Sequence, residues 1–171
     1  MKIAIMSDSH DNIWNLEKAL SLIKTEEASM IVHCGDFVAP FMLRELEKAG
    51  IPVYGVLGNN DGSQFLLAQT ALTVLKNIHL FELIGTVEAD GFRICFTHQR
   101  EVAEGLAFTG RYDLVCYGHS HQYNLEKIKD TILLNPGEIM GKNKEPGFCL
   151  VDTENRHVRR LILDVPRGIE A

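Results

Sequence analysis

The sequence predicts an α/β protein with two packed β-sheets and with helices on their outer faces. Two patterns lead to this prediction. In the first third of the chain, apolar strand patterns alternate with helical patterns, which is typical of βαβ units and a parallel sheet. In the second half, pairs of strand patterns flank short turn signals, which is typical of antiparallel hairpins. Because both sheets need covering faces, we expect the helices to lie outside them.

The first third is expected to contain three strands and two helices. The longer helical pattern repeats apolar residues at intervals of three or four positions. After the second helical pattern, Gly50 suits a C-terminal cap and Pro52 prevents continuation of the helix. The expected elements are the strand Lys2–Met6, the helix Asn12–Glu27, the strand Met30–His33, the helix Ala39–Ala49 and the strand Val53–Leu57.

The second half is expected to contain three hairpins, a helix and a further strand. Asp90-Gly91 is a strong signal for a two-residue turn, because both residue types accept positive φ angles. Lys129-Asp130 and Glu154-Asn155 mark the other two turns. The expected elements are the strands Gly85–Ala89 and Phe92–Thr97, the helix Glu101–Thr109, the strand Asp113–Tyr117, and the paired strands Tyr123–Ile128 with Thr131–Leu134 and Phe148–Asp152 with His157–Leu163.

Composition restricts the classes of function. The chain has 171 residues, 46% of them hydrophobic, and a formal net charge of −6, so we expect a single domain spanning residues 1–171. The acidic balance argues against an extended nucleic-acid-binding surface. No apolar run approaches the roughly 18 residues of a membrane span, and Asp8 follows the first apolar segment too soon for a signal peptide. We therefore expect a soluble, cytoplasmic protein.

Two further features concern thiol chemistry and assembly. No CxxC pair is present, so we expect four buried, reduced thiols, with a thiolate metal site as the alternative. The apolar segments Phe65–Leu67 and Leu72–Leu75 exceed what one core is expected to cover, which indicates a homo-oligomer. The four cysteines are Cys34, Cys95, Cys116 and Cys149.

Polar residues cluster where the predicted apolar strands end. Because loops at the carboxyl ends of strands are where α/β proteins place ligands, we expect these clusters to meet at one edge. Each motif alone is compatible with an ordinary turn, whereas their regular order after five strands indicates a shared site. The clusters are Asp8-Ser9-His10, Gly35-Asp36, Gly58-Asn59-Asn60-Asp61, Thr97-His98 and Gly118-His119-Ser120-His121.

The side chains in these loops point to metal binding. Aspartate, asparagine and histidine supply the oxygen and nitrogen atoms that suit divalent manganese, iron, zinc, nickel or cobalt. Seven candidate ligands exceed the four to six that one ion needs, so two ions sharing a carboxylate is the economical interpretation. The remaining histidines, His33, His79 and His157, are expected to be structural or exposed.

The ordered motifs Asp-x-His, Gly-Asp, Gly-Asn-x-Asp, a lone His and Gly-His-x-His resemble those of the calcineurin-like metallophosphoesterases. The short chain and Asn135-Pro136-Gly137 are similar to the small YfcE-type phosphodiesterases in particular. The resemblance extends from Lys2 to about Asp152. It implies a four-layer αββα sandwich with a two-metal site at the sheet edge.

The resemblance also implies a role for each motif residue. A hydroxide bridging the two ions would attack a phosphodiester, while a phosphomonoesterase or a non-catalytic binding scaffold on the same fold are the alternatives. All seven ligand positions carry competent side chains, which favours an enzyme over a scaffold, and we expect its substrate to be a small phosphodiester. The first ion would be held by Asp8, His10, Asp36 and His121, and the second by Asp36, Asn59, His98 and His119.

Several positions depart from the family pattern. Many relatives carry a histidine, thought to be the general acid, where this chain has Asn60, so we expect either slow turnover or an Asn60 amide that binds a phosphate oxygen. Without that histidine as partner, Asp61 is expected to fix its loop. Gln99 replaces the usual glycine after His98, and Glu138 stands where serine is common. Glu138 is expected either to support the site or to repel bulky anions.

Three residues beside the ligand loops are candidates for substrate contact. Arg100 is positioned in the sequence to meet a phosphate, although a solvated arginine is the simpler interpretation. Asn12 and Phe37 are candidate pocket residues.

Overall fold

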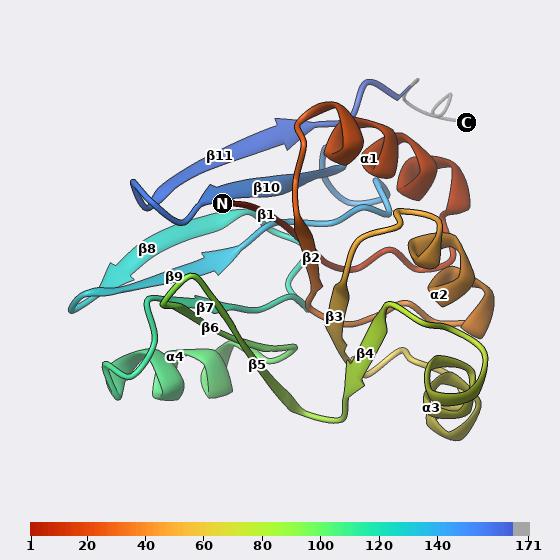
Figure 1. Cartoon of the computed structure of the whole chain (residues 1–171), viewed down its shortest axis with the longest axis horizontal. Helices are drawn as coiled ribbons and strands as arrows, with labels where there is room; N and C mark the ends of the chain where they lie inside the picture. The colour runs from red at the N-terminus through yellow and green to blue at the C-terminus, as the bar shows by residue number, and fades with distance from the viewer. Residues whose placement is uncertain (166–171) are drawn as a thin grey trace.

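The computed structural model describes residues 1–165. Two β-sheets pack face to face, with α1, α2 and α3 outside the first sheet and α4 outside the second (Figure 1). The first sheet has the strand order β11-β10-β1-β2-β3-β4 and the second has the order β5-β6-β7-β9-β8. The predicted four-layer αββα sandwich of two mixed sheets is therefore confirmed.

The first sheet combines four parallel strands with a C-terminal hairpin. Strands β1 to β4 run parallel, whereas β10 pairs antiparallel with β1 and with β11. The elements of this half are β1 (Lys2–Met6), α1 (Ile13–Thr25), β2 (Met30–His33), α2 (Pro40–Glu47), β3 (Val53–Val56), α3 (Gln64–Thr73), β4 (Ile78–Phe81), β10 (Gly147–Asp152) and β11 (His157–Ile162).

The second sheet is built from two hairpins and a central strand. The turn between β5 and β6 has φ angles of 52° at Asp90 and 78° at Gly91, as expected for the predicted tight turn. Strand β7 pairs in parallel with β6 and β9. The elements are β5 (Ile84–Ala89), β6 (Phe92–Thr97), α4 (Arg100–Phe108), β7 (Leu114–Cys116), β8 (Asn124–Ile128) and β9 (Thr131–Asn135).

Three apolar clusters fill the spaces between the four layers. One joins α1, α2 and α3 to the first sheet, one lies between the sheets, and one joins α4 to the second sheet. The four cysteines are buried and free, as predicted, and burial raises the pKa of Cys95 to about 11 and that of Cys149 to about 12. These two thiols therefore stay protonated, which argues against a thiolate metal site.

Helix α3 and strand β4 were not predicted from the sequence. Helix α3 buries Leu67, Thr70 and Ala71 but exposes Phe65 and Leu72, so apolar residues occur on both its faces and no helical stripe stands out. These exposed side chains agree with the apolar surface expected for self-association, which stays a prediction. The assignment of all 171 residues to a single domain also stays a prediction, since residues 166–171 lie outside the described part.

The parallel register brings the loops of the site together. Met6 pairs with His33, and His33 pairs with Gly55, so the loops after β1, β2 and β3 leave one edge of the first sheet. Phe96 pairs with Cys116 in the second sheet, which brings the loops after β6 and β7 side by side. Among residues 1–165, no helix is long and apolar enough to cross a bilayer.

Asp113 connects the two sheets. Its carboxylate accepts hydrogen bonds from the backbone and side chain of Arg93 in β6, and from Arg156 in the β10–β11 turn of the other sheet. Burial opposes its ionisation, yet the contacts with Arg93 and Arg156 lower its pKa overall. Because the folded state then favours the ionised form, Asp113 stabilises the fold above the unfolded pKa of about 4.

We expect Asp113→Asn to lower the free energy of unfolding at pH 7 by about 1–2 kcal/mol, a modest value because both arginines are half exposed. The difference from the unsubstituted protein should shrink as the pH falls below about 4, where the carboxylate becomes protonated. Urea unfolding at several pH values, with chelator present, measures both effects. The fully exposed Asp130 is the control position. An equal loss in Asp130→Asn would contradict this role.

Candidate metal centre

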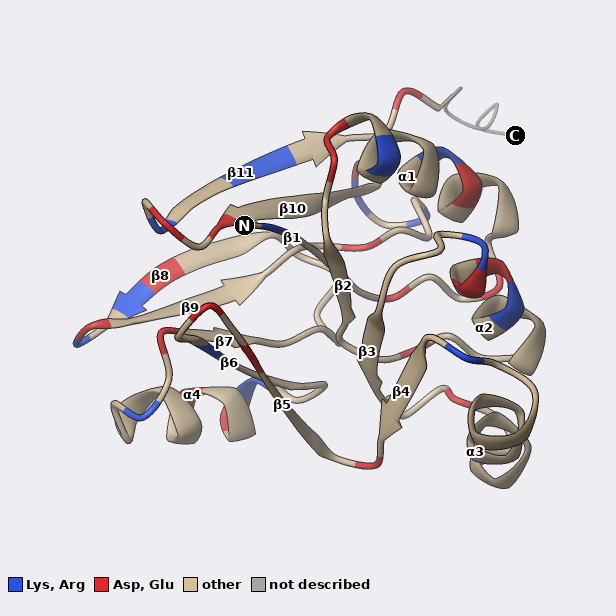
Figure 2. Cartoon of the chain, in the orientation of Figure 1, with Lys and Arg blue, Asp and Glu red and all other residues tan. Residues whose placement is uncertain are grey.

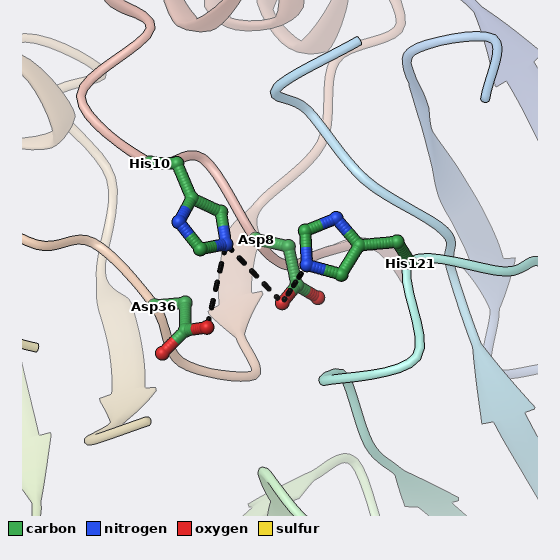
Figure 3. Close-up of side chains that lie close together, drawn as sticks. All are labelled: Asp8, His10, Asp36 and His121. Carbon is green, nitrogen blue, oxygen red and sulfur yellow. Dashed lines mark ion pairs between the residues drawn. The ribbon is translucent and has the colours of Figure 1, made fainter. Parts of the chain in front are cut away.

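Four predicted ligands meet between the two sheets. Figure 3 shows Asp8, His10, Asp36 and His121 directed toward one another, and one ligand atom from each lies within 4.8 Å of the others. Nε2 of His10 lies 3.3 Å from Oδ2 of Asp36 and 3.8 Å from Oδ1 of Asp8. Nε2 of His121 lies 3.5 Å from the same Asp8 oxygen. This group has the donor types and spacing of a divalent metal site.

The other three predicted ligands form a second group beside the first. Oδ1 of Asn59 lies 2.9 Å from Nε2 of His98 and 2.6 Å from Nδ1 of His119. Nε2 of His98 is also 3.5 Å from Oδ2 of Asp36. The same Asp36 oxygen therefore borders both groups, which is the geometry expected of a carboxylate shared by two ions.

The protonation pattern fits a cation at both positions. Oδ1 of Asp8 and Nε2 of His10 are buried without a hydrogen-bond partner among the described residues. Nδ1 of His98 lies 2.8 Å from the carbonyl oxygen of Cys34, which can only accept a hydrogen bond, so Nδ1 carries a proton. In the tautomer with its proton on Nδ1, His98 presents the lone pair of Nε2 to Asn59 Oδ1, which is also an acceptor. Facing acceptors repel each other, and a cation between them removes the repulsion.

The two buried carboxylates perturb the titration of their neighbours. Interactions with Asp36 and then Asp8 raise the pKa of His10 to about 9, although burial acts in the opposite direction. Burial opposes ionisation of Asp36, but the interaction with His10 and the two hydrogen bonds from Asn60 lower its pKa below the ordinary value. A proton on His10 thus supplies part of the positive charge that these carboxylates require.

Most of the predicted metal ligands have a left-handed backbone conformation. Left-handed φ angles are uncommon for residues other than glycine and cost of order 1–3 kcal/mol each. Five of the seven predicted ligands adopt them, which concentrates strain at the site. Their φ angles are 54° at Asp8, 42° at His10, 61° at Asp36, 66° at His119 and 59° at His121.

A buried histidine supports the Gly35-Asp36 loop. The N–H of Gly35 donates to Nδ1 of His33 at 3.2 Å, and Nε2 of His33 lies 3.1 Å from Ser9 Oγ. Ser9 in turn donates to the carbonyl of Asp36 at 3.5 Å. Burial lowers the pKa of His33 to about 3, so the ring is neutral. The expected structural role of His33 is confirmed, although the sequence did not reveal that it serves the metal-site loop.

Asn60 and Asp61 hold the loops around Asp36. The backbone N–H and the side-chain amide of Asn60 each donate to a different Asp36 oxygen at 2.8 Å. Asp61 accepts from the N–H groups of Gly58 and Val38, both at 2.7 Å, and from that of Asp36 at 3.3 Å. With its oxygens directed at backbone donors, Asp61 is placed to fix the loop.

The structure gives the three candidate substrate residues other contacts. Phe37 is buried in the core and stacks on His33, whereas its expected role as a pocket residue stays a prediction. Asn12 caps α1 and donates to the carbonyl of Met140 at 2.8 Å. Arg100 is bound to Glu104, Glu126 and Tyr117, so its guanidinium is not directed at a free phosphate position.

Asn135 and Glu138 contact the loop that carries His119 and His121. Nδ2 of Asn135 donates to the carbonyl of Gly118 at 2.8 Å and to Ser120 Oγ at 3.0 Å. Glu138 makes a short contact with His121 through Oε2 and Nδ1. Of the two roles expected for Glu138, the supporting one matches this geometry. The role of Asn135 was missed, because no spacing in the sequence links it to Gly118.

Comparison with known proteins agrees with this geometry. A sequence model of the calcineurin-like phosphoesterase superfamily domain matches residues 1–156. This chain belongs to that superfamily. Phosphodiesterase MJ0936 of Methanocaldococcus jannaschii is 35% identical over 170 residues, covering 96% of this chain and 100% of the relative. The probable metallophosphoesterase YsnB of Bacillus subtilis is 28% identical, covering 81% and 75% of the two chains.

Several solved structures share the fold. An archaeal phosphodiesterase matches with a TM-score of 0.88 at 34% identity, over 95% of this chain and 100% of the other. The phosphoesterase Yfce from Escherichia coli matches with a TM-score of 0.68 at 18% identity, over 96% and 100%. Vacuolar Protein Sorting 29 from Cryptosporidium parvum matches with a TM-score of 0.68 at 16% identity, over 94% and 95%. The last two show the fold alone.

The close approach of Gly58 to Asp36 gives a test of this arrangement. A Cβ at position 58 would lie 2.2 Å from Asp36 Oδ1 and 2.5 Å from its backbone nitrogen, so Gly58→Ala must displace the shared carboxylate. We expect Mn²⁺ affinity, measured by calorimetry, to fall by about 10- to 100-fold.

Gly105→Ala is the matched control, since its Cβ meets nothing within 4 Å and alanine favours the helix. Its Mn²⁺ affinity should equal that of the unsubstituted protein. Unchanged affinity in Gly58→Ala would show that Asp36 does not need its observed position.

Proposed function

We propose that this superfamily member is a metal-dependent phosphodiesterase with two divalent ions. The observation that carries the proposal is the position of Asp36 Oδ2, which borders the Asp8–His10–His121 group and the Asn59–His98–His119 group. The 35% identity to a protein named as a phosphodiesterase supports the choice of substrate class.

The residues of the site would have separate roles in metal binding and in phosphate contact. Two divalent ions held at this site would supply an activated water nucleophile and would stabilise negative charge on the phosphate. One ion would be held by Asp8, His10 and His121 and the other by Asn59, His98 and His119, with Asp36 shared between them. The exposed Asn60 lies against Asp36, where its amide can donate to a phosphate oxygen but cannot deliver a proton at neutral pH. Esters with good leaving groups are therefore the expected substrates.

The donor set supports manganese, nickel, cobalt, iron or zinc over calcium or magnesium, because imidazole nitrogens contribute to both positions. Lys and Arg are interspersed with Asp and Glu over several elements (Figure 2), which supports a small phosphodiester over a long nucleic acid. The buried, free cysteines are compatible with the reducing cytoplasm, the proposed location.

Two alternatives have separate experimental outcomes. Phosphomonoesterase activity would appear as preferential hydrolysis of an aryl phosphomonoester over an aryl phosphodiester, each assayed with Mn²⁺ and with chelator. A non-catalytic scaffold would bind Mn²⁺ and hydrolyse neither ester. The fold alone does not discriminate between an enzyme and a scaffold, and at 16% identity the likeness to a Vacuolar Protein Sorting 29 structure shows only the fold.

Dialysis against chelator should abolish hydrolysis of an aryl phosphodiester, and Mn²⁺, Ni²⁺ or Co²⁺ should restore it. Asp36→Asn should retain fewer than two ions per chain and lose about 10²–10³-fold in rate, because it weakens both positions. Asn59→Ala should weaken one ion only, as elemental analysis of both variants will show. Full activity in metal-free protein, or two ions and a normal rate in Asp36→Asn, would contradict the proposal.

Asn60→His tests the missing proton donor. A positioned general acid contributes about 10²–10⁴ in rate, and its benefit grows as the leaving group becomes more basic. Asn60→His should therefore accelerate alkyl or nucleoside phosphodiesters much more than nitrophenyl ones, measured at saturating metal. Asn60→Ala should leave the nitrophenyl rate nearly unchanged unless the amide binds phosphate. Equal acceleration of both ester types would mean that position 60 does not face the leaving group.

A further inference from the structure

Glu138 is a buried acid outside the predicted ligand set that contacts one of the ligands. Its side chain is fully buried, and Oε2 approaches Nδ1 of His121. The other oxygen, Oε1, accepts the backbone N–H groups of Asn143 at 2.7 Å and Lys144 at 2.8 Å. One carboxylate oxygen of Glu138 therefore contacts a predicted metal ligand, and the other binds the backbone of the segment that follows Glu138 in the chain.

The contact determines which nitrogen of His121 is available to a metal. The Glu138 carboxyl group acts as an acceptor here, since Oε1 receives two backbone N–H groups, and this geometry assigns a proton on Nδ1 of His121 that is donated to Oε2. The tautomer with its proton on Nδ1 has its lone pair on Nε2, which lies 3.5 Å from Asp8 Oδ1. Histidine ligands whose second nitrogen donates to a carboxylate are held in one tautomer and one orientation.

We propose that Glu138 is a positioning residue that fixes His121 as a ligand through Nε2 and couples this orientation to segment 142–146. The inference rests on the proposed function, since it concerns the same metal centre. The coupling runs through Oε1, because the backbone of Asn143 and Lys144 holds the carboxylate from the side opposite His121. The neighbouring carbonyl of Glu138 accepts from Gly147 at 2.9 Å, which closes the segment onto β10.

A glutamine cannot reproduce these contacts, although it has nearly the same size. It offers one acceptor oxygen and one NH₂ donor, whereas the site presents donors on both sides. If the amide oxygen accepts from His121, its NH₂ faces the N–H groups of Asn143 and Lys144. The reverse orientation leaves the Nδ1 proton of His121 without an acceptor and permits the other tautomer.

We expect Glu138→Gln to bind Mn²⁺ about 10- to 100-fold more weakly than the unsubstituted protein, measured by calorimetry on the full chain. The tautomer is read independently by ¹⁵N NMR of labelled imidazole with Zn²⁺ bound. The unsubstituted protein should show His121 protonated at Nδ1, and Glu138→Gln should lose this signal. Amide exchange at Asn143 and Lys144 should accelerate in the same variant. Glu88→Gln removes the same charge from an exposed position on β5 and should change nothing.

The outcomes separate this inference from the proposed function. If the unsubstituted protein binds no divalent ion, the proposed function itself fails. If it binds Mn²⁺ and Glu138→Gln binds equally well with its Nδ1 signal intact, only the role of Glu138 is overturned. Should Glu138→Gln not fold, the Zn²⁺-loaded unsubstituted protein still decides, because coordination of His121 through Nδ1 would contradict the proposal.

Discussion

The architecture of the site depends on burying Asp8 and Asp36 where imidazole and amide acceptors already converge. Removing carboxylates from water is costly unless positive charge or hydrogen bonds compensate. Part of the compensation comes from His10, whose pKa is raised, and from two hydrogen bonds that Asn60 donates to Asp36. However, Asp8 Oδ1 and His10 Nε2 have no hydrogen-bond partner among the described residues. The compensation is incomplete without further positive charge, and this incompleteness favours cation binding.

The surrounding structure holds that arrangement in place. Parallel strands deliver the loops to one edge, and left-handed backbone at most of the ligands turns their side chains inward. His33, Asp61 and Asn135 then pin the loops through buried hydrogen bonds to backbone groups. The glycines at 58 and 118 leave room for the Asp36 and Asp8 carboxylates, which a Cβ at either position would meet at less than 3 Å.

The two sheets contribute unequally to the centre. The first sheet supplies the Asp8, Asp36 and Asn59 loops, whereas the second supplies His98 and the His119–His121 loop. The two sets of loops stay together only while the sheets are packed, so contacts between the sheets, such as that of Asp113 with Arg156, help to preserve the site. Glu138 belongs to the same class of contact, because it joins a ligand from the second sheet's loops to the segment that enters β10.

Because motifs, turns and apolar periodicity are local, the sequence predicts the candidate ligands, most of the strands and the α/β sandwich. It did not reveal α3, whose exposed Phe65 and Leu72 obscure its buried face. Only the tertiary structure shows that Asp36 borders both ligand groups and that Phe37 lies in the core. It also shows that Arg100 binds Glu104 and Glu126. Apart from the local Arg100–Glu104 pair, these outcomes depend on packing between segments distant in the chain, and periodicity along the sequence carries no record of it.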